Sequence, residues 1–468
     1  MSTLADTRPL SFKEKVGYGL GDMASNFYLG FFGLYLLYYY TDVYGLAPAA
    51  VGVMLLISKI TDAISDPVMG LIADRTESRW GKYRPYLLWV AIPYGILGFA
   101  IFFGPNFSDT GRLIYAYVTY IGVMIAYTAI NVPYSALLAV ISPVAEERTK
   151  ATTYRFICAG LGSLFVAALA TPLVGILGGG DDVLGFRYTI ALFAVLSIAI
   201  FWFTFATTKE RIKLPRHKTK VSSDLKELLK NVSWIVLAIS CILILVGFVA
   251  RLSSIIFYVK YYMEDTSNIS FLIFDNVALF SSIGIIGQII GSITTPYWVK
   301  LMSKHYLVLL MCMIHTVLLV ISYFVSPDMY WTAVVLNFFG IMTFGVIITV
   351  VFAMFTDCAE FGEWITGARA SGLTVSASMF ALKFGSAVGG ALPGFILGFV
   401  GFVSNEVLTE TALQGVRMMS TIVPAVLFAA GGLIMLFYKL DKSLLDKIEK
   451  ELMQRREDAG HNEPQAQS

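Results

Sequence analysis

Twelve apolar runs, separated by short polar connections, divide the 468-residue chain. A helix needs about 20 apolar residues to cross the ~30 Å hydrocarbon core of a bilayer, and each run is close to this length or longer. Hydrophobic residues make up 57% of the chain and charged residues only 14%, whereas soluble domains have about 25% charged residues. We therefore expect an all-α integral membrane protein with 12 transmembrane helices, at residues 18–41, 49–74, 86–104, 113–142, 151–177, 187–207, 233–258, 271–297, 306–325, 330–356, 372–403 and 418–438.

Lysine and arginine residues gather on one side of these runs. Of the 34 such residues, 26 lie in the two termini and in alternate connections, whereas the remaining connections hold only Arg112, Arg187, Lys260 and Arg417. Because cytoplasmic loops carry the excess of positive charge, both termini are predicted to be cytoplasmic. The polar start has no apolar core or cleavage site of a signal peptide. The expected divisions are a tail (1–17), a six-helix bundle (18–207), a cytoplasmic middle loop (208–232), a second six-helix bundle (233–438) and a tail with an amphipathic helix (439–468).

The two halves repeat a short pattern. "DAISDPVMGLIAD" at the end of the second run corresponds to "GSITTPYWVKLMS" at the end of the eighth, with Pro67 aligned to Pro296. Six runs plus six, with repeated halves, is typical of secondary transporters whose binding sites lie near the bilayer midplane between the halves. In this alignment only the first half has carboxylates, Asp62 and Asp66.

Lys59, Asp62 and Asp66 lie three and four residues apart inside the second run, which places them on one helix face. A charge at the bilayer centre costs about 2.5–3.5 kcal/mol on insertion scales, so such residues normally face a bundle interior or a hydrated cavity. Two carboxylates one turn apart can bind a hard cation or share a proton. The alternative is a structural ion pair with Lys59, although that pair leaves one carboxylate in excess.

Three further basic residues lie inside apolar runs: Arg155, Arg251 and Lys383. For Arg251 the favoured interpretation is an ion pair with Asp275, toward the outer side of the membrane.

Four stretches resemble the glycoside–pentoside–hexuronide:cation symporters, which are melibiose-permease-like members of the major facilitator superfamily. They read "LYYYTDVYGL", "DAISDPVMGLIADRTESRWGKYRP", "NVPYSAL" and "DCAEFGEWITGARASG", and the resemblance extends from residue 18 to about 439. It implies two pseudo-symmetric bundles that rock around a central cavity and couple uptake of a glycoside, pentoside or hexuronide to H⁺ or Na⁺. It also implies a multi-pass protein of the cell inner membrane, and we expect a monomer without cofactor or nucleic-acid partner.

The resemblance assigns the coupling ion to the second and fourth runs. Asp62 and Asp66 match the family's cation-site carboxylates, and Thr128 matches a hydroxyl linked to that site. Asn131 stands where melibiose-type members have an aspartate that binds both cation and sugar. One negative charge is therefore missing, so H⁺ is slightly preferred over Na⁺. Two basic residues match positions near the carboxylates and are expected to act in coupling, Lys59 and Lys383.

The expected sugar site comprises Asp22, Asn26, Tyr127, Asn131, Arg155 and Lys383. Arg155 matches the family's sugar-binding arginine, whose planar fork can reach two hydroxyls or a uronate; an ion pair with Asp22 is the alternative. Asn26 stands where melibiose-type members have a sugar-binding aspartate, and helix–helix hydrogen bonding is its alternative role. Ser135 stands where those members have a sugar-stacking tryptophan, so their galactoside preference is not expected here.

Opposed charges follow the second and tenth runs. The superfamily resemblance implies a cytoplasmic gate whose ion pairs join the halves, whereas basic loops that merely follow the positive-inside tendency are the alternative. The expected gate residues are Arg75, Arg84, Arg148, Asp357, Glu360, Glu363 and Arg369.

Other functional classes are less consistent with the sequence. Of the four histidines only His315 lies inside an apolar run, and no metal-ligand spacing, nucleophilic triad or nucleotide-binding loop occurs. An enzyme is therefore not expected. A major-facilitator carrier of an organic anion or amphiphile is the alternative transporter, and a channel is a further alternative.

Overall fold

The computed structural model describes residues 8–212, 231–263, 275–366, 371–404 and 408–441, together with five positions between 444 and 451. Within these ranges the side chains of several residues are not described, among them Lys59, Asp74 and Glu363. The regular structure of the described part is entirely helical. Its α-helices are α1 (Phe12–Phe31), α2 (Pro48–Arg75), α3 (Arg84–Trp89), α4 (Ala91–Ile101), α5 (Asp109–Ile141), α6 (Ala145–Gly178), α7 (Asp182–Thr207), α9 (Val232–Phe257), α10 (Asn276–Leu301), α11 (Lys304–Tyr323), α12 (Tyr330–Thr366), α13 (Ser371–Phe399), α14 (Glu410–Ser420) and α15 (Ile422–Ile434).

Some helices begin at polar caps, which satisfy backbone N–H groups that have no partner within the helix. Ser11 and Glu14 form a capping box at the start of α1, with Ser11 N–H donating to Glu14 Oε2 over 2.8 Å. Asp275 caps α10, its Oδ1 accepting the N–H of Ala278 over 2.7 Å. Polar caps thus set the first residues of α1 and α10.

Nine helices of the described part are long and apolar enough to cross a membrane. Each of the twelve expected ranges overlaps a helix or a succession of helices. For example, the range 86–104 is divided between α3 and α4, and 418–438 between α14 and α15. The first range continues from α1 through two π-helices, η1 (Phe32–Leu36) and η2 (Tyr39–Val43). The all-helical membrane architecture is thus observed, whereas the number of spans stays a prediction.

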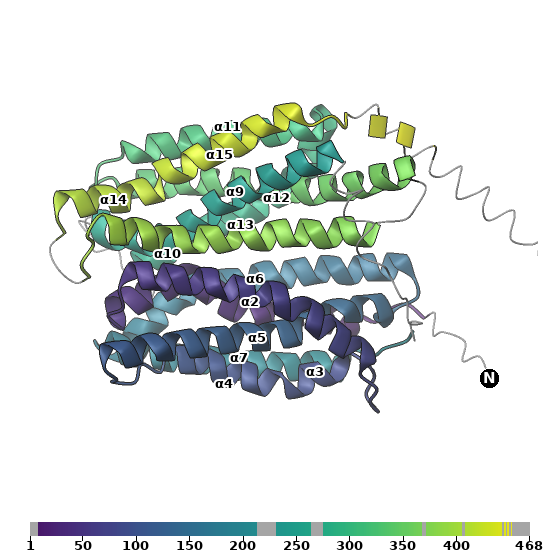
Figure 1. The fold of residues 1–468 in the computed structure, drawn as a ribbon, viewed down its shortest axis with the longest axis horizontal. Helices are drawn as coiled ribbons and strands as arrows, with labels where there is room; N and C mark the ends of the chain where they lie inside the picture. Colours follow the sequence, from purple (N-terminus) through teal and green to yellow (C-terminus); the bar gives the residue numbers. More distant parts are fainter. Residues whose placement is uncertain are drawn as a thin grey trace, which may run out of the picture.

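The helices form two bundles, stacked one above the other in Figure 1. In the lower one, the N half, α1 packs against α6 and α7; in the upper one, the C half, α9 packs against α13 and α15. The halves meet along two main pairs, α2 with α13 and α6 with α10. Small residues allow the α2–α13 approach: a Cβ on Gly394 would lie 2.6 Å from the Pro48 carbonyl oxygen.

One end of the molecule, which we term the closed end, joins the halves through residues 38–42 and 257–261. Here η2 follows α1, and a third π-helix, η3 (Tyr258–Tyr262), follows α9 at the corresponding place in the C half. Lys260 Nζ donates a hydrogen bond to the Tyr38 hydroxyl, and the Tyr261 hydroxyl donates to Asp42 Oδ1. π-Helices are rare and frequently occur at functional sites.

A third polar contact between the halves lies between α6 and the start of α10. Thr171 Oγ1 donates to Asp275 Oδ1 over 2.8 Å. The expected ion pair between Asp275 and Arg251 is wrong: Arg251 instead donates to the carbonyl of Ser420 and to Asn337 Oδ1 within the C half. Asp275 is held at the helix start by its capping role, so its carboxylate does not reach Arg251.

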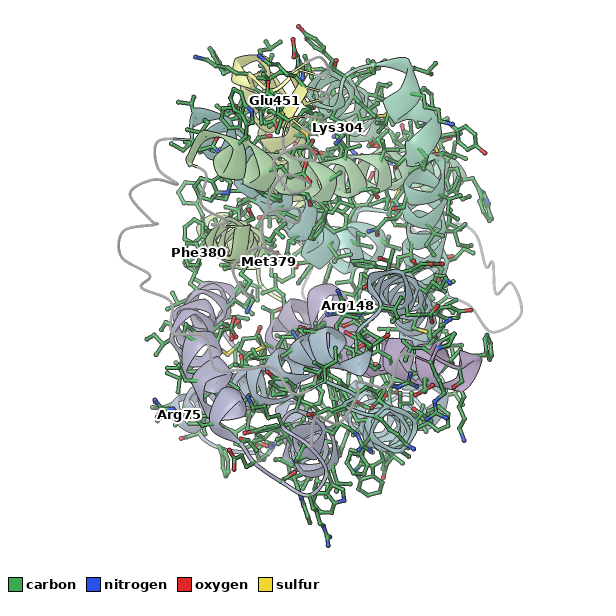
Figure 2. All side chains as sticks on the ribbon, turned by 90° about the vertical axis from the view of Figure 1, so that its right-hand side faces the viewer. Arg75, Arg148, Lys304, Met379, Phe380 and Glu451 are labelled. Atoms are coloured by element: carbon green, nitrogen blue, oxygen red, sulfur yellow. The ribbon has the colours of Figure 1, made fainter. Side chains whose placement is uncertain are left out.

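The opposite end, which we term the basic end, is viewed in Figure 2. Arg75 and Arg148 lie on the N half, and Lys304 and Glu451 lie on the C half. Lys304 Nζ contacts both carboxylate oxygens of Asp357, at 2.9 and 2.7 Å, and so ties α11 to α12 rather than to the N half.

Candidate functional site

Asp66 lies at the contact between the halves and has partners on both sides. Thr128 of α5 donates its hydroxyl to Asp66 Oδ1 over 3.0 Å, and Lys383 of α13 donates its ammonium to Asp66 Oδ2. Thr128 is buried, whereas the side chains of Asp66 and Lys383 are 26% and 41% exposed. Water or a small ion can reach a partly accessible ion pair of this kind, whereas it cannot reach a fully buried pair.

Asp62 lies one turn before Asp66 on α2 and is buried, only 3% exposed. Thr128 also accepts a hydrogen bond from Ser65 Oγ over 3.3 Å, so the hydroxyl lies between two side chains of the carboxylate-bearing helix. Asn131 is half-buried one turn further along α5, and its Oδ1 is enclosed without a hydrogen-bond partner among the described residues. The Lys59 side chain lies outside the described part.

These residues fit a proton or a monovalent cation better than a tightly held divalent metal. No group of three or more His, Cys, Asp or Glu side chains with metal-binding geometry occurs in the part of the chain that the structure describes. Two carboxylates with a hydroxyl supply few oxygen ligands. The Lys383 ammonium already compensates part of the negative charge of the carboxylates. The structure therefore brings together Asp66, Thr128 and Lys383, as the family resemblance implies, with Asp62 one turn away.

Arg155 and Asp22 form the second charged pair at membrane depth. Arg155 Nε lies 3.2 Å from Asp22 Oδ2, and its Nη2 donates to Asp22 Oδ1 over 3.3 Å. The guanidinium also lies over the Tyr134 ring, 5.0 Å from its centroid. The ion pair foreseen as the alternative for Arg155 is thus present, and a contact with sugar stays a prediction.

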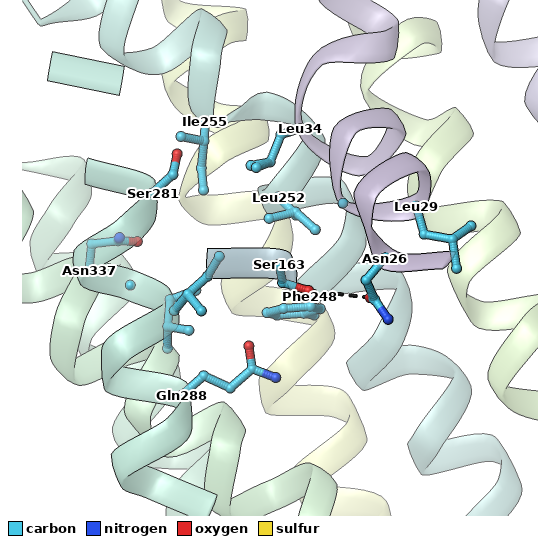
Figure 3. Close-up of a pocket in the computed structure, with 14 residues that line it drawn as sticks. Asn26, Leu29, Leu34, Ser163, Phe248, Leu252, Ile255, Ser281, Gln288 and Asn337 are labelled. Carbon is cyan, nitrogen blue, oxygen red and sulfur yellow. Dashed lines mark hydrogen bonds between the residues drawn. The ribbon is translucent and has the colours of Figure 1, made fainter. Parts of the chain in front are cut away.

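A cavity of about 230 Å³ lies between the halves, and its lining residue Asn26 donates a hydrogen bond to the backbone carbonyl of Asp22. Its polar lining residues are Asn26 and Ser163 from the N half and Ser281, Gln288 and Asn337 from the C half. Ser163 Oγ donates to Asn26 Oδ1 over 3.3 Å, the dashed line in Figure 3. Of the residues expected to bind sugar, only Asn26 lines this cavity; the others lie outside its lining: Asp22, Tyr127, Asn131, Arg155 and Lys383.

The C-half polar residues of the cavity were missed at the sequence level. Gln288 and Asn337 are amides inside apolar runs, and this is the signal that could have found them. Burying an amide costs less free energy than burying a charge, so a buried amide is a weaker indicator of a functional site. Arg251 lies directly behind Asn337, its Nη2 donating to Asn337 Oδ1 over 3.0 Å.

The described contacts of three expected gate residues stay within their own half. Arg84 donates to the carbonyls of Trp80 and Phe205, at 3.3 and 2.7 Å, and Arg148 to those of Ser142 and Pro143, at 2.9 and 3.1 Å; Asp357 contacts Lys304. Arg75 is exposed and Glu360 half-buried. The Glu363 side chain and the whole of Arg369 lie outside the described residues. A gate that joins the halves at the basic end therefore stays a prediction.

Comparison with known proteins agrees with this architecture. The model of the family described as MFS/sugar transport protein matches residues 17–442. The putative glycoside/cation symporter YagG of Escherichia coli is 33% identical, and the alignment covers 98% of each chain. The isoprimeverose transporter of Lactiplantibacillus pentosus is 33% identical over 92% of this chain and 89% of its own. The glucuronide carrier protein homolog of E. coli is 30% identical over 96% of each chain.

These matches extend over nearly the whole chain and include both halves. Family members and relatives are transporters rather than enzymes, and the nine membrane-spanning candidates among the described residues fit a multi-pass protein of the inner membrane. The chain belongs to the MFS/sugar transport proteins, among the glycoside–pentoside–hexuronide:cation symporters.

Proposed function

We propose that the protein carries a small glycoside or pentoside across the inner membrane together with H⁺ or Na⁺, with H⁺ as the preferred ion. The contact between Lys383 and Asp66 is the observation that carries this proposal. It joins α13 of the C half to α2 of the N half through the carboxylate that the sequence assigns to the coupling ion. A bound ion at this position can therefore change how the halves are held together.

The proposed coupling is a competition for Asp66. Without the ion, the Lys383 ammonium compensates the Asp66 carboxylate at membrane depth, where an unpaired charge is costly. A proton or Na⁺ that binds at Asp62 and Asp66 supplies one positive charge there, which replaces the charge of the ammonium at Asp66 and so releases Lys383. Release weakens the contact between α2 and α13 and makes the ammonium available to a sugar hydroxyl.

We further propose that the closed end faces the cell exterior. This orientation follows from the predicted cytoplasmic termini, because α1 begins at the basic end and finishes at the closed end. The contacts of Tyr38 with Lys260 and of Asp42 with Tyr261 would then seal the outer entrance. The described structure would represent a state in which the central cavity communicates with the cytoplasm.

The coupling proposal is tested with Asp62→Asn in proteoliposomes. The wild-type protein should concentrate a glycoside when a pH or Na⁺ gradient is imposed. Asp62→Asn should abolish this accumulation and leave some exchange of sugar without a gradient, since the amide keeps the size of the side chain and removes its charge. Asp109→Asn is the matched control, because the Asp109 side chain is 95% exposed. A variant Asp62→Asn that still concentrates sugar normally would refute the assignment.

An organic anion is the second candidate cargo. Arg251 is buried, 5% exposed, and its described contacts are to Asn337 and to the Ser420 carbonyl rather than to a carboxylate. Its charge lies behind the cavity wall and would attract an anion. Competition for uptake between neutral glycosides and matched anionic compounds distinguishes the two cargoes.

A further inference from the structure

The chemistry of the cavity between the halves is neutral. Its polar side chains are amides and hydroxyls only, and no ionisable side chain is among its lining residues. Amides donate and accept hydrogen bonds, which matches hydroxyl groups. A carboxylate placed there would lose its hydration without gaining a direct counter-charge.

Most of these polar groups are already engaged by protein partners. Asn26 Nδ2 donates to the backbone carbonyl of Asp22 over 2.8 Å, and Asn26 Oδ1 accepts from Ser163. Asn337 Oδ1 accepts from Arg251, and Asn337 Nδ2 donates to the Phe280 carbonyl over 3.0 Å. Their hydrogen-bonding capacity for a ligand is therefore largely used.

Two residues of α10 keep their hydrogen-bonding capacity for a ligand. Ser281 is 3% exposed, and its hydroxyl has no hydrogen-bond partner among the described residues. The half-buried Gln288 carboxamide makes no hydrogen bond within the described part of the chain, and it points toward Phe248 and Ser163 (Figure 3). Ser281 and Gln288 are seven residues apart and thus share one helix face. Gly284 lies between them on this face, where a Cβ would approach Asn337 Nδ2 to 2.7 Å.

Phe248 supplies an apolar surface next to these groups. Its ring stacks on Phe344 with centroids 3.5 Å apart and planes within 5°, which fixes its orientation. Phe248 is half-buried and lines the cavity, so part of its surface remains available. A flat aromatic ring beside amide groups suits a sugar, which has both an apolar face and hydroxyl edges.

We propose that Gln288 and Ser281 of α10, with Phe248 of α9, form the part of the sugar site that lines this cavity on the C half and select neutral glycosides over uronates. The inference rests on the proposed transport function. The ligand lies between Asn26 and Ser163 on the N-half wall of the cavity and Gln288 of the C half, which supplies the unused hydrogen-bonding groups. Because one ligand then contacts both halves, its binding favours the arrangement in which they close around it.

The test compares a xyloside, a glucoside and a glucuronide with the same aglycone in counterflow exchange by the reconstituted full chain. The wild-type protein should take a neutral glycoside with a half-saturating concentration at least about tenfold below that of the glucuronide. Gln288→Met keeps the length of the side chain and removes its hydrogen bonds, so it should raise the value for the neutral glycoside about tenfold. Ser281→Ala should raise it about threefold, by the smaller number of lost hydrogen bonds.

Gln414→Met is the matched control. Gln414 is exposed on α14, so this substitution should leave transport unchanged. The Gln288 variant is shown to be folded if it elutes as a monodisperse peak and if it still binds sugar in response to a proton gradient when the sugar is saturating. Preference of the wild-type protein for the glucuronide, or an unchanged half-saturating concentration in Gln288→Met, would overturn the inference while leaving symport intact. Absence of saturable exchange for all three sugars would overturn the proposed function itself.

Discussion

Asp66 and Lys383 illustrate how two single residues can couple the halves of a membrane protein. Each is a charge at membrane depth, and each is tolerated because the other lies within hydrogen-bonding distance. Thr128 holds the second carboxylate oxygen of Asp66 over 3.0 Å, so the carboxylate has a fixed orientation toward Lys383. The pair is partly exposed, and solvent therefore reduces its contribution to stability below that of a sealed pair.

The pair can be measured with a double-mutant cycle of Asp66→Asn and Lys383→Gln. Each single variant leaves one uncompensated charge at the interface, whereas the double variant leaves none. We therefore expect non-additivity of about 1 kcal/mol or more in unfolding free energy, with the double variant more stable than the sum of the single changes predicts. Thermal unfolding of the purified protein in detergent provides the measurement. Additive effects would mean that the two side chains do not interact in the membrane protein as it exists in solution.

Charged residues at membrane depth could be predicted from the sequence because their cost is large. The contacts of Asp66 with Thr128 and Lys383 are those that the family resemblance implies, and Arg155 is paired with Asp22, the alternative that was foreseen. Gln288 was missed because a neutral amide inside an apolar run costs little free energy and is also common in hydrogen bonds between helices. The predicted partner of Arg251 was wrong because the sequence gives the depth of a residue in the membrane but not the rotation of neighbouring helices relative to each other.

At the scale of elements, the contact of α2 with α13 depends on the absence of side chains. A Cβ on Gly394 would lie 2.6 Å from the Pro48 carbonyl oxygen, and one on Gly52 would lie 3.0 Å from that of Ala391. The glycine-rich sequence of α13 favours close packing against a neighbouring helix. It did not indicate the partner helix, because small residues specify that a neighbour comes near and not which neighbour it is.

Gly394→Ala should therefore disfavour the close approach of α2 and α13 near the closed end. Backbone atoms cannot move aside as easily as the tip of a flexible side chain, so we expect the rate of sugar exchange to fall about tenfold or more. Exchange in proteoliposomes is the readout. Gly175→Ala is the control, because a Cβ there meets nothing within 4 Å and alanine is a better helix former. Equal exchange rates in the two variants would show that this crossing does not tighten during transport.

At the scale of the whole molecule, the two ends differ in how the halves are joined. At the closed end, polar contacts link Tyr38 to Lys260 and Asp42 to Tyr261. Asp42, Lys260 and Tyr261 belong to π-helices at corresponding places of the two halves, and Tyr38 directly precedes η2. At the basic end, the described contacts of Arg148 and Lys304 remain within their own halves. Alternating access requires the halves to be joined at one end in each state, and the described contacts at the closed end are of this kind.

The orientation of these ends is tested by labelling single cysteines in intact cells with a membrane-impermeant maleimide. Asp328 lies exposed in the connection between α11 and α12, and Ser78 lies exposed between α2 and α3 at the opposite end. The four native cysteines are buried, which keeps background labelling low. If the termini are cytoplasmic, Asp328→Cys should be labelled in intact cells and Ser78→Cys only after the membrane is opened. The reverse pattern would place the closed end in the cytoplasm, and the described state would then be open to the outside.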